Sequence, residues 1–190
     1  MATASSPRTR NQKPARNGAR TLSQGLQVEP LFCPANVASP FDTVTWTKRS
    51  AQIKDESGKL MFEQKDVEIP ENWTQLATNV IVSKYFYGEN GTPERENSVK
   101  QLIHRVTRTI ADWGIADGYF ATAEDGENFY RDLTWLCLNQ HGAFNSPVWF
   151  NVGLFHQYGV KGAACNWHWD QETEQVRIPE NPYEYPQGSA

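Results

Sequence analysis

The chain has 190 residues, of which 38% are hydrophobic, and 7 Trp, 9 Phe and 7 Tyr supply bulky material for a core. This length suits one domain, or one domain with a tail, and the composition excludes a wholly disordered chain. Three cysteines without a secretory signal argue against a disulfide scaffold and predict a reducing, cytoplasmic location. No apolar run is long enough to cross a membrane, so the glycosylation patterns at Asn72 and Asn90 are expected to stay unused.

Charge is unevenly distributed, and the division falls near residue 25. Residues 1–25 carry five of the 18 basic residues and no acid, which leaves 13 basic against 22 acidic groups in the remainder, a net charge of −9. A basic stretch with almost no large apolar residue cannot bury enough surface to order itself. We therefore predict a disordered tail over 1–25, with a targeting or nucleic-acid-binding arm as the alternative. The acidic body disfavours a general nucleic-acid binder.

Residues 26–43 contain three prolines among scattered apolar side chains, which predicts an irregular segment along the surface of the core. Cys33 stands in this segment without basic neighbours that would stabilise a thiolate. We interpret it as a packed thiol and not as a reactive one.

A hairpin is predicted over 44–69. Two strand-like runs, 44–47 and 60–62, flank a polar turn with Gly58 near its end, and Pro70 closes the second run. Apolar residues of 73–81 then recur at helical spacing, although the run 80–82 would also suit a strand. Gly88 is expected to end either element.

The clearest helical pattern of the chain covers residues 94–113. Thr92 is expected to cap this helix, Pro93 to occupy its first turn and Gly114 to stop it. His104 lies next to the apolar stripe, and we interpret it as a satisfied surface group and not as a ligand. The stripe itself is predicted to consist of Val99, Leu102, Ile103, Val106, Ile110 and Trp113.

A second helical pattern follows Thr122 and runs to Gly142, the residue expected just past the end of a helix. Cys137 falls on its apolar stripe and is predicted to pack in the core. No internal repeat is present, so residues 26–142 read as one region made of a hairpin and helices. The stripe of this second helix comprises Phe129, Tyr130, Leu133, Leu136 and Cys137.

Residues 143–152 are predicted to form a buried strand. Pro147 cannot continue a helix, and the apolar residues 148–150 favour a strand packed on both faces. Asn145 and Ser146 stand at its polar start, where an amide and a hydroxyl suit contact with a polar ligand. The alternative is that both side chains only satisfy local backbone groups.

The remaining residues, 153–188, contain glycines, prolines and aromatic residues without a regular period. Cys165 and His168 have the spacing of one zinc-ligand pair, and His156 and Asp170 are within reach. No second pair completes a set of four ligands. We therefore favour a packed loop here and assign no metal.

Several runs of the chain, all in the same order, resemble the class II, adenosylcobalamin-dependent ribonucleotide reductases. The most specific run is Phe-Asn-Ser-Pro-Val-Trp-Phe-Asn at 144–151, which is similar to the first barrel strand of that family. The resemblance covers about residues 41–152 and resumes at 186–190. The upstream runs that carry it are 53–55, 62–70, Ser-Lys-Tyr-Phe at 83–86, Gly-Thr-Pro-Glu-Arg-Glu at 91–96, and 118–120.

This resemblance implies a mixed α/β fold, in which a mainly helical amino-terminal region with a hairpin leads into an incomplete ten-stranded α/β barrel. It implies reduction of ribonucleotides to deoxyribonucleotides by a cysteine thiyl radical, with adenosylcobalamin as cofactor. It also implies a thiol reductant such as thioredoxin and allows a homodimer. By position, Ser146 matches a residue that holds the substrate, and Ala190 matches the substrate-site residue just before the first redox cysteine.

The catalytic cysteines of the family have no counterpart in this chain, because Cys33, Cys137 and Cys165 do not match their positions. We therefore expect an amino-terminal part of a reductase that is inactive alone, with 143–190 as the first barrel strand and an aromatic loop. The alternative from a different class is a small helical protein-interaction module, or a gene remnant. The coding sequence beyond Ala190 would separate the two.

Overall fold

The computed structural model describes residues 25–160, 168–170 and 173–177. The fold is mixed α/β, as predicted, and the tail over 1–25 stays a prediction because it lies almost wholly outside these residues. The elements, in chain order, are η1 (Pro40–Thr43), β1 (Trp46–Lys54), β2 (Leu60–Pro70), α1 (Gln75–Tyr85), α2 (Val99–Ala116), α3 (Ala123–Leu138), α4 (Ser146–Asn151), α5 (Leu154–Tyr158), β3 (His168–Asp170) and β4 (Gln175–Arg177).

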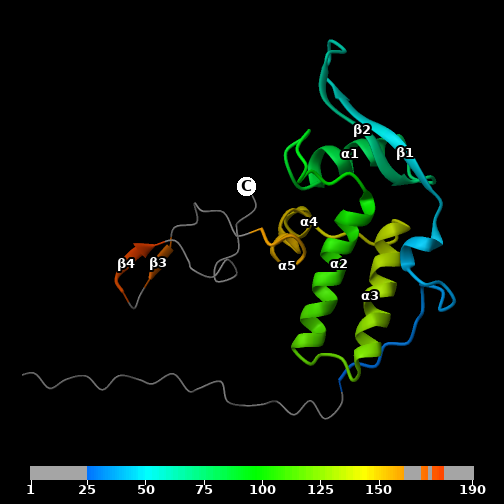
Figure 1. Cartoon of the computed structure of the whole chain (residues 1–190), viewed down its shortest axis with the longest axis vertical. Coiled ribbons are helices and arrows are strands. Elements are labelled where there is room, and N and C mark those ends of the chain that lie inside the picture. Colours follow the sequence, from blue (N-terminus) through cyan, green and yellow to red (C-terminus); the bar gives the residue numbers. More distant parts are fainter. Residues whose placement is uncertain (1–24, 161–167, 171–172, 178–190) are drawn as a thin grey trace, which may run out of the picture.

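The predicted hairpin is confirmed. Strands β1 and β2 pair antiparallel, with Trp46 opposite Pro70 and Lys54 opposite Leu60. Asp55 closes the turn, because one of its carboxylate oxygens accepts hydrogen bonds from the backbone N–H groups of Ser57 and Lys59, each at 2.9 Å. The turn projects away from the helices, whereas the base of the hairpin packs on α1 and α2 (Figure 1).

Helix α1 follows the hairpin directly. Thr74 caps it by accepting a hydrogen bond from the backbone N–H of Ala77. The run 80–82 lies within this helix and is therefore not a strand. The helix ends at Tyr85, before Gly88. Its inner face places Val82 and Thr78 in the interior, each with none of its surface exposed.

Helix α2 forms where a helix is predicted but begins later, at Val99. Ser98 and Gln101 make a capping box, whereas Thr92 and Pro93 lie in turns before the helix. Gly114 does not stop α2, which continues to Ala116. A Cβ at Gly114 would meet the ring of Phe120 at 2.5 Å, so this position needs glycine for close packing and not for termination.

The stripe predicted for this helix is largely buried. Val99, Leu102 and Val106 have none of their surface exposed, and Ile103 has 1%. Trp113 departs from the prediction, because it is 40% exposed near the end of the helix. These side chains pack against residues from β2, α1 and α3 in a single apolar core.

Helix α3 begins as predicted, since Thr122 and Asp125 form a capping box. It ends at Leu138, earlier than Gly142 suggests. Gln140 takes the left-handed conformation that terminates the helix, with φ of 59°, and the backbone N–H groups of His141 and Gly142 bond to the carbonyl of Leu136.

The strand predicted over 143–152 is wrong, because the structure places helix α4 there. Pro147 lies in the first turn of α4, where no intrahelical N–H bond is lost, so it starts a helix that it could not continue. Trp149 is buried, and Val148 and Val152 pack against the core on the same side. Val148, Trp149 and Val152 therefore form the inner face of a short helix, whereas Phe150 is 38% exposed.

The segment before η1 lies along α3 as an irregular strap, which confirms its predicted place on the core surface (Figure 1). Asp132 holds it by accepting hydrogen bonds from the backbone N–H groups of Leu31 and Cys33, each at 2.8 Å. Arg131 donates to the carbonyls of Pro34 and Val37. Several backbone groups of the strap are thus satisfied by side chains of one helix, whereas Leu26 pairs with the backbone of Tyr119 and Ala121.

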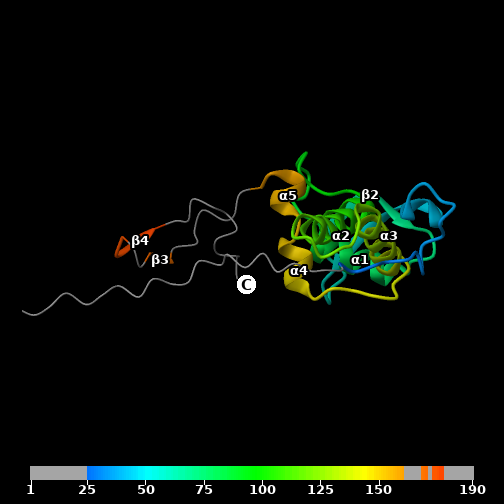
Figure 2. The ribbon, with the colours of Figure 1, turned by 90° about the horizontal axis from the view of Figure 1, so that it is seen from below.

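Helices α4 and α5 lie on the side of α2 that faces away from α3, and both views agree on this (Figures 1 and 2). Helix α4 also contacts α1. The sheets among the described residues are two-stranded and antiparallel, so no part of a barrel is present in them. Ser146 is the first residue of α4, which packs against α1 and α2.

Candidate functional site

The hydroxyl of Ser146 is bound by a side chain far away in the sequence. Its Oγ lies 3.1 Å from the phenolic oxygen of Tyr85, the last residue of α1. Ser146 is half-buried at the start of α4, where Asn145 makes no side-chain cap. The alternative of a purely local role for Ser146 is therefore not what the structure shows, because its hydroxyl joins two helices.

Tyr85 is held on both its backbone and its ring. The ring centroid lies 5.3 Å from that of Phe150 on α4. Arg95 closes the end of α1, because its guanidinium donates to the carbonyls of Val82 at 2.6 Å and of Phe86 at 2.7 Å. The tyrosine hydroxyl is thus presented to Ser146 from an anchored helix end.

A buried ion pair joins the loop before α2 to the middle of that helix. Nε of Arg105 lies 2.9 Å from a carboxylate oxygen of Glu96, and both side chains are 1% exposed. Glu96 also accepts hydrogen bonds from the backbone N–H of Tyr87 and the hydroxyl of Tyr158, each at 2.7 Å. A charge pair removed from water is retained only when such additional bonds satisfy it.

Arg105 fixes α4 and α5 through their backbone. Its guanidinium donates to the carbonyl of Trp149 at 3.0 Å and to that of Val152 at 2.8 Å, where α4 ends. Gly153 follows with φ of 86°, and a Cβ there would collide with the backbone carbonyl of Arg105. The close approach and the left-handed backbone both require glycine.

Tyr158 completes this anchor from α5. Its side chain is partly exposed, but its hydroxyl reaches the buried carboxylate of Glu96. Desolvation and the negative charge of Glu96 raise the pKa of Tyr158 well above its ordinary value. The phenol is therefore protonated at neutral pH and can donate its hydrogen bond to Glu96.

Sequence reasoning missed the Glu96–Arg105 pair. One signal was present: Arg105 lies three residues after Leu102 and one before Val106, both fully buried. A charged residue between apolar residues of one helical face suggests a buried partner.

His104 differs from its predicted surface position, because it is half-buried between α2 and α3. Its Nδ1 lies 2.8 Å from the hydroxyl of Tyr130, and burial together with the charge of Arg108 lowers its pKa. The histidine is satisfied by this bond, and no group of three potential ligands that could hold a metal occurs in the described part of the chain. Cys165 lies outside that part, so the zinc-pair hypothesis stays untested.

The packed thiols are confirmed at two positions. Cys33 is 2% exposed and Cys137 is 6% exposed. Burial raises the pKa of Cys33 and raises that of Cys137 to about 11. Both sulfurs are therefore protonated at neutral pH, which is unsuited to thiol redox chemistry.

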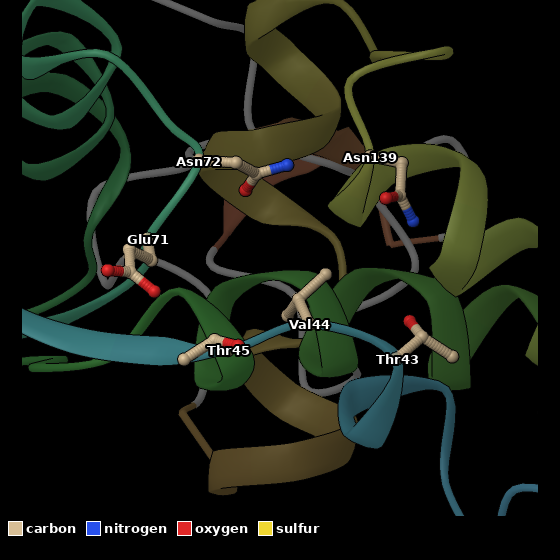
Figure 3. Close-up of a pocket in the computed structure, with 6 residues that line it drawn as sticks. All are labelled: Thr43, Val44, Thr45, Glu71, Asn72 and Asn139. Carbon is tan, nitrogen blue, oxygen red and sulfur yellow. The ribbon is translucent and has the colours of Figure 1, made fainter.

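A polar hollow of about 420 Å³ lies where η1, the ends of the hairpin and the end of α3 meet (Figure 3). Among the described residues, Glu71 is its only charged lining residue, and Ser146 does not line it. The hollow is therefore separate from the Ser146–Tyr85 pair. The lining residues are Thr43, Val44, Thr45, Glu71, Asn72 and Asn139.

Ala190, the other predicted substrate-site residue, lies outside the described residues, so its role stays a prediction. None of the helices that the structure describes has both the length and the apolar character needed to span a membrane.

Comparison with known proteins identifies the matching family. Residues 47–140 match the family model for class II vitamin B12-dependent ribonucleotide reductase. The vitamin B12-dependent ribonucleotide reductase of Rhodopirellula baltica is 68% identical over 167 residues, which are 87% of this chain and 16% of that protein. Proteins of the same name from Streptomyces coelicolor and Streptomyces clavuligerus are 44% and 42% identical, over 68% and 74% of this chain and 13% and 15% of their own length.

The chain thus spans about a sixth of the length of the curated relatives it matches. The family model covers the hairpin, α1, α2 and α3, and ends before Ser146. The similarity to Rhodopirellula baltica extends over most of the chain, well beyond that model. The chain therefore belongs to the class II vitamin B12-dependent ribonucleotide reductases, of which it represents an amino-terminal portion.

Proposed function

We propose that this chain supplies the amino-terminal region of an adenosylcobalamin-dependent ribonucleotide reductase, and that Ser146 binds the ribonucleotide substrate in it. The observation that supports this role is the position of the Ser146 hydroxyl, held at 3.1 Å from Tyr85 on a helix anchored by buried charges. A hydroxyl fixed in this way can bond a polar ligand without losing further side-chain freedom. The reaction itself is inferred from the family.

We propose that the barrel implied by that family is built from residues outside the described ones, because residues 143–152 form a loop and α4 in place of its first strand. Adenosylcobalamin supplies the radical chemistry when bound. We assign none of the described residues to it. The hollow beside η1, of about 420 Å³, and a second one of about 550 Å³ between β2 and the loop over 90–97 are lined mainly by polar side chains and offer no apolar wall for a corrin ring.

The remaining partners are part of the same proposal. A thiol reductant such as thioredoxin would re-reduce the enzyme, and a reducing, cytoplasmic setting would suit it. Homodimer formation is compatible with the family. The buried, protonated thiols of Cys33 and Cys137 support the assignment of the redox steps to cysteines elsewhere in the reductase.

Ser146→Ala tests the role of this residue in binding. The test uses a reductase made by joining this chain to the remainder of the Rhodopirellula baltica relative. Removing one neutral hydrogen bond to the nucleotide should weaken its binding by roughly 0.5–1.5 kcal/mol, so KM should rise about two- to tenfold with kcat little changed. Steady-state assays of deoxyribonucleotide formation measure both constants.

Ser83→Ala is the matched control. It removes a serine hydroxyl from α1 that bonds only the local carbonyl of Val80, at 3.5 Å. Its KM should equal that of the parent. An unchanged KM for Ser146→Ala, with the control behaving as expected, would remove Ser146 from the substrate site.

A further inference from the structure

We propose that Tyr85 is a positioning residue for the substrate, acting through Ser146. Its phenolic oxygen lies 3.1 Å from Ser146 Oγ, a bond between residues 61 positions apart in the chain. The inference rests on the proposed role of Ser146. It adds a residue that neither contacts the substrate nor lies in the same part of the sequence.

The chemistry of two hydroxyls explains what such a pair can do. In a hydroxyl–hydroxyl hydrogen bond one group donates, and the accepting group keeps its own hydrogen for a third partner. When Tyr85 donates to Ser146, the serine hydrogen is free to donate to an oxygen of the nucleotide. The tyrosine thereby selects one rotamer of the serine hydroxyl from the several that an isolated serine would sample.

The surroundings of Tyr85 make it suitable for this task. Arg95 bonds the carbonyls of Val82 and Phe86 on either side of it, and Phe150 packs on its ring with the centroids 5.3 Å apart. The guanidinium of Arg105 also approaches the backbone carbonyl of Tyr85, at 3.5 Å. The hydroxyl can therefore act as a fixed reference for Ser146.

A purely structural tether between α1 and α4 is the competing explanation for the same bond. The two explanations differ in what the loss of the tyrosine hydroxyl should change. A tether contributes to stability and leaves substrate binding alone. A positioning residue changes KM, and it does so only while the serine hydroxyl is present.

Tyr85→Phe removes the hydroxyl and keeps the ring that packs on Phe150. In the joined reductase we would measure KM, kcat and melting temperature for the parent, Tyr85→Phe, Ser146→Ala and the double variant. Tyr85→Phe should raise KM about two- to tenfold with kcat within about twofold of the parent. The double variant should have the KM of Ser146→Ala, because the pair acts as a unit. Tyr119→Phe, on a tyrosine that is 56% exposed, is the control and should change nothing.

The results that would contradict these expectations separate the positioning role of Tyr85 from the proposed role of Ser146. An unchanged KM for Tyr85→Phe, with a raised KM for Ser146→Ala, overturns the positioning role and leaves the proposed function intact. Effects that add in the double variant also overturn it, because Tyr85 would then act independently of Ser146. A parent reductase without turnover, or a Ser146→Ala variant identical to the parent, contradicts the proposed function and with it this inference.

Discussion

Arg105→Met should lower the free energy of unfolding by about 3–5 kcal/mol, a large fraction of the total for a domain. The substitution leaves the carboxylate of Glu96 buried at 1% exposure without its counter-charge. It also leaves the carbonyls of Trp149 and Val152 without their donor. Chemical denaturation monitored by tryptophan fluorescence would measure the loss.

The effect should be localised as well as large. Hydrogen exchange should accelerate most in α4 and α5, because Arg105 holds the end of α4. Lys65→Met is the matched control: Lys65 pairs with Glu63 at 3.6 Å and is 69% exposed, so its loss should cost less than about 1 kcal/mol. Equal stability of the two variants would mean that Arg105 does not anchor these helices.

Leu102→Asp should cost roughly 3 kcal/mol or more, because it places a carboxylate in apolar surroundings. Leu102 has none of its surface exposed and packs in the core between the hairpin, α1 and α3. For a chain of this length, a loss of that size should lower the melting temperature by about 6 °C or more.

Leu76→Asp provides the same substitution at a different burial. Leu76 is 74% exposed in the first turn of α1, where a negative charge is favourable to the helix. The free energy of unfolding should fall by on the order of 1 kcal/mol or less. The melting temperature of this variant should therefore remain within a few degrees of that of the parent. Similar losses for both leucines would contradict the burial of Leu102.

The elements that the sequence predicted well are those with local signals. The hairpin has a turn closed by Asp55, and α3 begins at Thr122 with its own capping box. The predicted start of α2, at residue 94, is too early, because the apolar period cannot show where the cap lies. Ser98 and Gln101 form the capping box that marks the true start of α2, whereas Thr92 and Pro93 have the residue types of a helix start without forming one.

The strand predicted over 143–152 is wrong because a face of a short helix was mistaken for a buried strand. A run of three apolar residues is too short to separate a buried strand from a helical face. The better signal was Asn-Ser-Pro at 145–147, since proline is common in the first turn of a helix. The packing of Trp149 and Val152 on α2 then decides in favour of the helix.

The site was predictable only in part. Ser146 came from the family resemblance, and the structure adds its bond to Tyr85. Tyr85 lies in a run that carries the family resemblance, and Arg105 lies between buried positions of α2. The partners of these two residues could not be predicted, because the contacts join residues 61 and 44 positions apart. Such pairings are set by the packing of helices and not by local sequence.

The central claim, that this chain is the amino-terminal region of a working reductase, is tested most directly by comparing two proteins in one assay. The isolated 190-residue chain and the chain joined to the remainder of the Rhodopirellula baltica relative would each receive ribonucleotide, adenosylcobalamin and a dithiol reductant. Deoxyribonucleotide should form only with the joined protein. Turnover by the isolated chain, or a folded joined protein without turnover, would contradict the account.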